Sequence, residues 1–269
     1  FSTVLIKMDL DGETVYLDGS SQYAELGATA FDRRAMLDLS DGDIETIRVE
    51  PGKDDRSHIK YEMSIAPSGE IGLTEVIFVQ GTQFESFHST YAEMTPENRR
   101  RHYLELVSSI SQSAQAASDL VTDYTKYPGS MSFSVHALRY GVQQNGYLHF
   151  IIPENPLGSL LNYRSNERTL PLAWNDYTDL LAEYIILLPG GYEPAIMPPD
   201  FTWKAPGGAG TIDVSVEYDK MANAIRIVQT ADLKPALIPA EEFKGIIEAG
   251  RKLAHPNMTT ILLKKKDLQ

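Results

Sequence analysis

The sequence contains no cysteine, which excludes several kinds of chemistry at once. Without thiols the chain cannot form a disulfide, a thiolate metal site or a cysteine nucleophile. Long apolar runs are missing as well, since no stretch approaches the ~20 apolar residues of a membrane-spanning helix. The lack of cysteine does not fix the compartment, because exported proteins can also lack it.

Positive charge is scarce: 24 Lys and Arg residues stand against 37 Asp and Glu, a formal charge of −13 over 269 residues. Nucleic acids and anionic membranes attract basic surfaces, so we expect neither as a partner. The six histidines form no close pair of the zinc-binding kind. The glycine-rich stretches 189–191 and 206–210 lack the continuation of a phosphate-binding loop. Residues 7–18 follow a calcium-loop spacing only with Lys7 at the first ligand position. We predict no metal and no cofactor.

The first eighteen residues carry the sharpest local pattern. Val4, Ile6, Met8 and Leu10 alternate with residues of the opposite face, as in a strand. The dipeptide at 11–12, Asp-Gly, predicts a two-residue hairpin turn, because both of its positions tolerate positive φ. A strand that starts at residue 1 without an initiator Met or a leader indicates a piece of a longer protein.

This hairpin, FSTVLIKMDLDGETVYLDGS, resembles the last hairpin of the transglutaminase-like (papain-like) core of bacterial multidomain proteins. In that family the hairpin carries the His and the Asp of a Cys-His-Asp triad. Asp18 matches the Asp position, whereas Thr3 stands where the family has His. Gly19-Ser20 also departs from the usual Pro-Thr.

The remainder resembles the uncharacterised β-rich C-terminal domain of the same proteins. The features that carry this likeness are a Pro-led helix after a strand pair, the turn at 188–192 and the Leu-Leu-Lys-Lys ending at 262–265. The resemblance implies an upstream transglutaminase-like domain as partner, and a periplasmic, cell-envelope or secreted location. The parent protein would be a cysteine peptidase or acyltransferase.

A papain-like acyl transfer needs a thiolate, a His that activates it and a group that orients the His. This chain has no Cys, and Thr3 occupies the His position. We therefore predict that it is not an enzyme by itself, and that Asp18 is an inactive remnant of the triad. The predicted role is a non-catalytic accessory domain that stabilises the core or positions substrate or partner.

Three parts are predicted along the chain: a terminal hairpin of the core at 1–22, a connector at 23–53 with one short strand, and a β-rich domain at 54–269. Extended patterns recur in the last part. We expect strands at 59–65, 71–79, 130–142, 147–152, 180–188, 210–218, 222–228 and 259–264. The turn at 145–146, Asn-Gly, predicts that 130–142 and 147–152 form one hairpin.

Helical patterns are fewer. One covers 84–91, and a second follows Thr95-Pro96, which supplies an N-cap and a proline in the first turn, with an apolar stripe that reaches Ala117. A short third helix is predicted at 240–253. The basic run at 99–101 lies in a first turn, where the helix dipole disfavours cations, so we expect acidic partners for it. The fold class is mainly β (α+β): an antiparallel sandwich or bent sheet with two or three helices.

Two alternatives remain open. Trp174 and Tyr177 lie in an aromatic loop next to Asn and Asp, which is typical of a sugar-stacking platform, so the chain is alternatively a carbohydrate- or peptide-binding module of the cell envelope. Burial in a sandwich core is the favoured interpretation of these rings, because large aromatic side chains normally bury their area. An enzyme with an unfamiliar carboxylate site ranks last, because no spacing selects a pair of acids.

Overall fold

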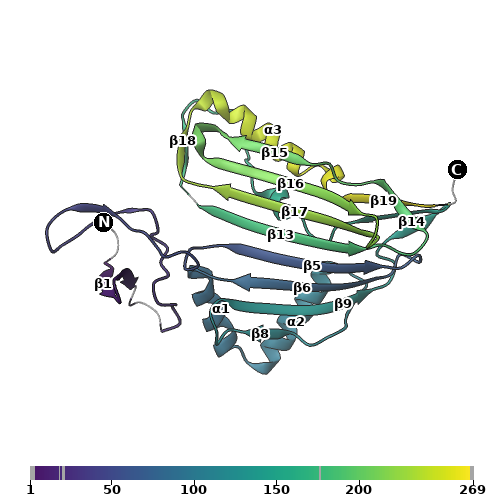
Figure 1. Cartoon of the computed structure of the whole chain (residues 1–269), viewed down its shortest axis with the longest axis horizontal. Coiled ribbons are helices and arrows are strands. Elements are labelled where there is room, and N and C mark those ends of the chain that lie inside the picture. Colours follow the sequence, from purple (N-terminus) through teal and green to yellow (C-terminus); the bar gives the residue numbers. More distant parts are fainter. Residues whose placement is uncertain (1–3, 18, 20–21, 176, 267–269) are drawn as a thin grey trace.

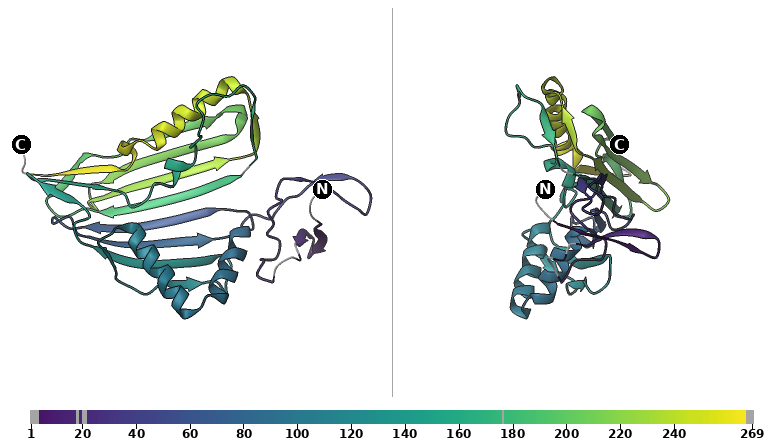
Figure 2. Two further views of the ribbon diagram at one scale, coloured as in Figure 1. Left: turned by 180° about the vertical axis from the view of Figure 1, so that it is seen from behind. Right: turned by 90° about the vertical axis from the view of Figure 1, so that its left-hand side faces the viewer.

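The computed structural model describes residues 4–17, 19, 22–175 and 177–266. A broad twisted sheet dominates the molecule, with its helices and a smaller sheet on one face (Figures 1 and 2). The N-terminal residues form a separate group of loops and short strands beyond one end of the broad sheet (Figure 1). The mainly β, α+β architecture confirms the predicted fold class.

The broad sheet has nine strands. In spatial order they are β15 (Phe201–Ala205), β16 (Gly210–Asp219), β17 (Ala224–Leu233), β13 (Thr178–Leu187), β5 (Ser57–Ile65), β6 (Ile71–Val79), β9 (Gly129–Ala137), and then β7 (Ala114–Ala116) and β8 (Val121–Asp123), which both pair with β9. Neighbours are antiparallel except β13 and β5, which run parallel. The parallel pair is the line where two antiparallel halves of the sheet meet.

The second sheet has four antiparallel strands, in the order β10 (Val142–Gln144), β11 (Tyr147–Ile151), β19 (Thr260–Lys265) and β14 (Tyr192–Ile196). Three two-stranded ladders complete the described strands. They are β1 (Ile6–Leu10) with β2 (Glu13–Leu17), β3 (Ala35–Leu37) with β4 (Ile44–Thr46), and β12 (Leu172–Trp174) with β18 (Ala236–Ile238).

The α-helices are α1 (Thr82–Glu93), α2 (Pro96–Ile110) and α3 (Phe243–Leu253). Short 3₁₀ turns are η1 (Pro156–Ser159), η2 (Pro206–Gly208), η3 (Ala240–Glu242) and η4 (Pro256–Met258). The N-cap prediction is confirmed, because the Thr95 side chain accepts a hydrogen bond from the backbone N–H of Asn98 at 3.3 Å. Helix α3 buries one apolar face and ends in basic residues, which complement the dipole.

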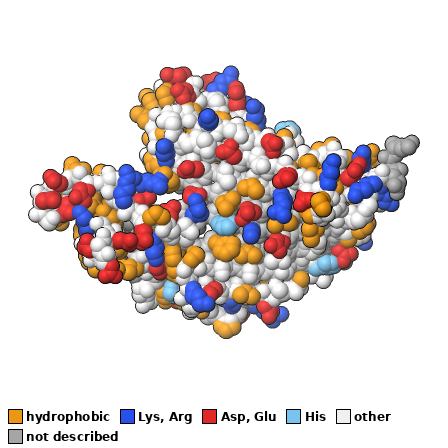
Figure 3. All heavy atoms as spheres, in the orientation of Figure 1, with side chains coloured by type: hydrophobic (Ala, Val, Ile, Leu, Met, Phe, Trp, Pro, Cys, Tyr) orange, Lys and Arg blue, Asp and Glu red, His pale blue; other side chains and the backbone are white. Residues whose placement is uncertain are grey.

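The core lies between the nine-stranded sheet and the elements on its covered face. Alternation places one set of each strand's side chains inside, including Tyr61, Tyr184 and Ile227 in one row across the sheet. The opposite face of the sheet is open, and charged side chains of both signs are mixed with hydrophobic ones on it (Figure 3). This is the usual division of an antiparallel sheet with one solvated face.

Two predicted boundaries are wrong. Residues 130–142 are not one arm of a hairpin: β9 pairs with β6, whereas β10 pairs with β11 in the other sheet. The chain changes sheet between them, where Arg139 has φ 57° and the Gly141 N–H donates to the Gly69 carbonyl at 2.8 Å. The second helix ends at Ile110, well before Ala117, because the following residues gain ladder hydrogen bonds with β9.

Among the residues that the structure describes, the basic run at 99–101 forms no ion pair with the acidic partners that we predict for it. Arg99 donates to the Leu120 carbonyl at 3.2 Å and to the Thr122 hydroxyl at 2.7 Å, and its guanidinium lies 5.3 Å from the Tyr91 ring centroid. Arg101 donates to the Asn98 amide oxygen at 2.6 Å. Neutral acceptors and an aromatic face therefore hold these cations.

Candidate functional site

The terminal hairpin forms as predicted from its turn. Asp11 has φ 54° and Gly12 φ 89°, the two positive values that a type I′ turn requires. The Asp9 carboxylate accepts a hydrogen bond from the Gly12 N–H at 2.9 Å, which supports the same turn. Asp18, the predicted remnant of a triad, and Thr3 lie outside the described residues, so their predicted roles stay predictions.

One side of this hairpin presents apolar side chains to solvent. Val4 is 80 % exposed, Ile6 59 %, Met8 36 % and Leu10 41 %. Among the described strands, β1 pairs only with β2. An isolated two-stranded hairpin is marginally stable in water, and an exposed apolar row on it marks a surface for another layer.

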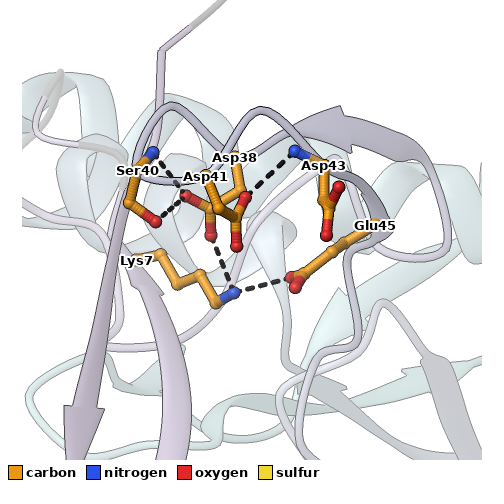
Figure 4. A network of polar contacts seen from close by, with 6 residues as sticks. All are labelled: Lys7, Asp38, Ser40, Asp41, Asp43 and Glu45. Atoms are coloured by element: carbon orange, nitrogen blue, oxygen red, sulfur yellow. Dashed lines mark hydrogen bonds and ion pairs between the residues drawn. The ribbon is translucent and has the colours of Figure 1, made fainter.

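The other side of the hairpin is fixed by charge. The Lys7 ammonium lies 2.9 Å from the Asp38 carboxylate and 2.6 Å from that of Glu45, so it joins β1 to the β3–β4 turn and to β4 (Figure 4). Asp38 also accepts hydrogen bonds from the Ser40 hydroxyl at 2.7 Å and the Ser40 N–H at 2.9 Å. These bonds, and then Lys7, hold the pKa of Asp38 below its ordinary value. The network is solvent-accessible, so it sets geometry more than stability.

An open cavity of about 490 Å³ separates the hairpin from residues 31–47. Its lining is mainly apolar, with a few charged and polar groups at its margin. The lining residues are Val4, Leu5, Lys7, Phe31, Arg34, Ala35, Met36, Leu37, Asp38, Leu39, Ser40 and Ile47. Large hydrophobic side chains are exposed around it, among them Leu37, Leu39 and Ile44. We call the exposed apolar row of the hairpin the N-terminal surface; the cavity lies mainly on the opposite, Lys7 side of β1.

Trp174 takes the buried position that the core interpretation of the aromatic loop predicts, whereas Tyr177 is more exposed. Trp174 is 9 % exposed and belongs to the hydrophobic core, where it pairs with Ala236 of β18. Tyr177 is more exposed, but the Arg33 guanidinium lies over its ring at 4.1 Å from the centroid. The Trp174 ring is therefore enclosed by the core, and one face of the Tyr177 ring is covered by Arg33. A ligand-binding role for the two residues stays a prediction.

One buried acid on the covered face of the sheet is not among the site residues that we predict from the sequence. Glu75 on β6 is 7 % exposed and lies between Tyr61 of β5 and Phe133 of β9 in the register of the sheet. Burial, followed by the charge of Glu154, raises the pKa of Glu75 to about 7. The sequence did contain one indication of this buried acid. Side chains alternate along the strand, so Glu75 points to the same, inward side as Leu73, where an apolar residue is expected.

Tyr61 and Tyr184 connect this acid to the segment after β11. Their rings stack at 4.9 Å between centroids. The Tyr61 hydroxyl donates to the Glu154 carboxylate at 2.5 Å, and the Tyr184 hydroxyl donates to the Glu154 backbone carbonyl at 2.8 Å. Burial is the main cause that raises the pKa of both phenols, so they act as hydrogen-bond donors.

The histidines take structural positions. His58 contacts the Glu183 carboxylate at 2.8 Å and stacks on Phe78, with 4.8 Å between ring centroids, and His136 contacts Glu70. Over the described ranges no three His, Cys, Asp or Glu side chains gather as metal ligands would. No helix in this part of the chain has the length and apolar character needed to span a bilayer.

Comparison with known proteins finds a similar domain for part of the chain. A family model for a domain of unknown function with a solved structure, DUF3858, matches residues 147–263. The match runs from β11 to β19, so it includes α3, four strands of the broad sheet and three of the smaller sheet. The chain is similar to this domain over that segment. β5, which pairs with β13, precedes the match.

A crystal structure of a candidate protease from Parabacteroides distasonis matches with 12 % sequence identity and a TM-score of 0.47. The alignment covers 97 % of this chain and 35 % of that one, so the chain spans about a third of the length of the solved protein. No curated protein matches.

Proposed function

We propose that this chain is a non-catalytic accessory region of a transglutaminase-like protein, and that its N-terminal surface docks on the catalytic core of that protein. The single observation that carries the proposal is the exposed apolar row of the β1–β2 hairpin. The sequence of this hairpin resembles the last hairpin of such a core, so the partner of the apolar row is the rest of that core. The chain has no Cys of its own, so the nucleophile must come from the core.

The free energy of burying the apolar row favours docking of the hairpin on the core. Burying a Val, Leu, Ile or Met side chain contributes about 1.5–3 kcal/mol, so covering the apolar row would stabilise a hairpin that is marginal by itself. The Lys7 network fixes the hairpin's other side against residues 38–45, which leaves the apolar row as the side available to a partner. Because the hairpin resembles that of a transglutaminase-like core, we also propose that the parent protein is periplasmic, in the cell envelope or secreted.

The test measures binding of this chain to the separately expressed transglutaminase-like domain of the parent protein, by calorimetry. A double substitution, Ile6→Asp with Met8→Asp, is expected to abolish the interaction, because a charged row cannot enter an apolar contact. Met221→Asp with Leu237→Asp is the matched control, since both residues are exposed and apolar but lie in the β16–β17 turn and on β18. Equal affinity of the hairpin variant and the wild type would reject the docking surface.

A second candidate is a peptide-binding module, and the cavity of about 490 Å³ favours it. Pockets of this size with apolar walls and a few polar groups are typical of ligand sites. Peptide-array binding by the isolated chain that is lost in Leu39→Asp would support it. A glycan array read with Trp174→Ala tests the carbohydrate alternative, and unchanged glycan binding would dismiss that site.

A further inference from the structure

Glu75 has no cation to balance it. Neither Glu75 nor Glu154 forms an ion pair with any residue that the structure describes, and Glu75 also lacks a hydrogen bond there to its carboxyl group. The side chains beside it on the covered face are Tyr61, Phe133 and Leu73, all buried. An ionised carboxylate in such surroundings carries a large desolvation cost, which a proton removes.

The one charge that acts on Glu75 is that of Glu154, and it is negative. Glu154 is exposed, so solvent screens part of its effect and burial of Glu75 is the larger cause. The other titratable groups facing this site are the phenols of Tyr61 and Tyr184, which remain neutral donors. Ionisation of Glu75 would therefore place a second negative carboxylate, besides that of Glu154, beside Tyr61.

Glu154 lies in the segment that joins the two sheets. Beyond its bonds to the two tyrosines, the segment is held by the Asn155 amide, which donates to the Leu253 carbonyl of α3 at 2.9 Å. The Ile152 N–H donates to the Thr259 carbonyl at 2.9 Å. Residues 152–161 are thus tied to the broad sheet by the bonds to Glu154 and to the elements around α3 by the neighbouring bonds, and Ile152, Leu157 and Leu161 are also buried in the core.

We propose that Glu75 is a proton-binding site: its protonated form keeps residues 152–161 fastened to the nine-stranded sheet, and loss of the proton releases them. An ionised Glu75 is relieved by hydration and by distance from the Glu154 charge, and both increase when the segment that carries Glu154 moves away. The device couples pH to the joint between the two sheets. It involves residues remote from the N-terminal surface and does not depend on the proposed docking.

The sign of the pH dependence follows from the raised pKa. A carboxyl whose pKa is about 7 when folded and 4.5 when free binds its proton more tightly in the folded state. Its contribution to stability is complete below the free value and is lost as pH rises through the folded value. From pH 5 to pH 8 the unfolding equilibrium constant should increase roughly 70-fold on account of this group.

Urea unfolding of the full chain at pH 5 to 8.5 tests this. Glu75→Gln should remove the increase, whereas Glu62→Gln, on the open face of β5, should keep the wild-type profile. The result is the difference between variant and wild type at each pH, so contributions that both proteins share cancel. An unchanged profile in Glu75→Gln would overturn the proposal.

Hydrogen exchange separates release of the segment from a merely structural effect. Protection factors of the Ile152, Gly158 and Leu160 amides, which donate to described carbonyls, should fall about tenfold or more above pH 7 in the wild type and stay level in Glu75→Gln. Constant protection in the wild type would refute the release. Should Glu75→Gln fail to fold, NMR titration of the wild-type Glu75 carboxyl decides: ionisation already complete at pH 5.5 would exclude the site.

Discussion

Two glycines of helix α3 offer a paired test of how the helix packs. A Cβ built on Gly250 would lie 2.6 Å from the Leu161 carbonyl oxygen and 3.0 Å from the Leu161 Cβ. A Cβ built on Gly245 would meet no atom within 4 Å. The same substitution, Gly→Ala, should therefore have opposite effects at the two positions.

The magnitudes come from two opposing effects. Alanine is better than glycine inside a helix by about 1 kcal/mol, so Gly245→Ala should raise the free energy of unfolding by up to that amount. At Gly250 the same gain is outweighed, because a contact of 2.6 Å with a backbone oxygen forces α3 away from residues 158–161, and such overpacking costs about 1–3 kcal/mol. The two variants should differ by roughly 1–3 kcal/mol, or several degrees in Tm.

Urea unfolding followed by circular dichroism measures both variants under one condition, with equal m-values as the check that the unfolding transition is unchanged. The wild-type value lies between the two expected results. A Gly250→Ala protein as stable as Gly245→Ala would show that α3 does not pack closely on residues 158–161.

Three other expectations concern single contacts. Gln229 on β17 is buried, and neither amide atom is hydrogen-bonded to a described residue. Gln229→Met should therefore raise the free energy of unfolding in urea by about 1–3 kcal/mol. A lower free energy of unfolding would show that the amide does have partners. Thr95→Ala removes the N-cap of α2 and should cost about 1 kcal/mol, whereas Thr95→Ser should restore most of it. Asn223→Ala should destabilise the β16–β17 turn, because Asn223 has φ 50° and its amide donates to the Leu188 carbonyl at 3.2 Å. A thermal midpoint equal to that of the wild type would contradict this prediction.

Local chemistry made several elements readable from the sequence. The hairpin at 11–12 and the N-cap at Thr95 depend on residues only a few positions apart, and both form as expected. The failures occur where a distant strand competes. Residues 114–116 extend the apolar stripe of a helix, yet they pair with β9 because a sheet edge was available. No local pattern reveals such an edge.

The sequence by itself determined the fold class, most strand positions and the absence of a cysteine nucleophile, because alternation, turn chemistry and composition are local properties. Only the tertiary structure decided which strands share a sheet, that Trp174 is buried and that Glu75 has no cation beside it among the described residues. Those features depend on contacts between residues far apart in the chain. Glu75 and Glu154 are 79 positions apart, and only the packing of the segment after β11 on the broad sheet brings the charge of one onto the other.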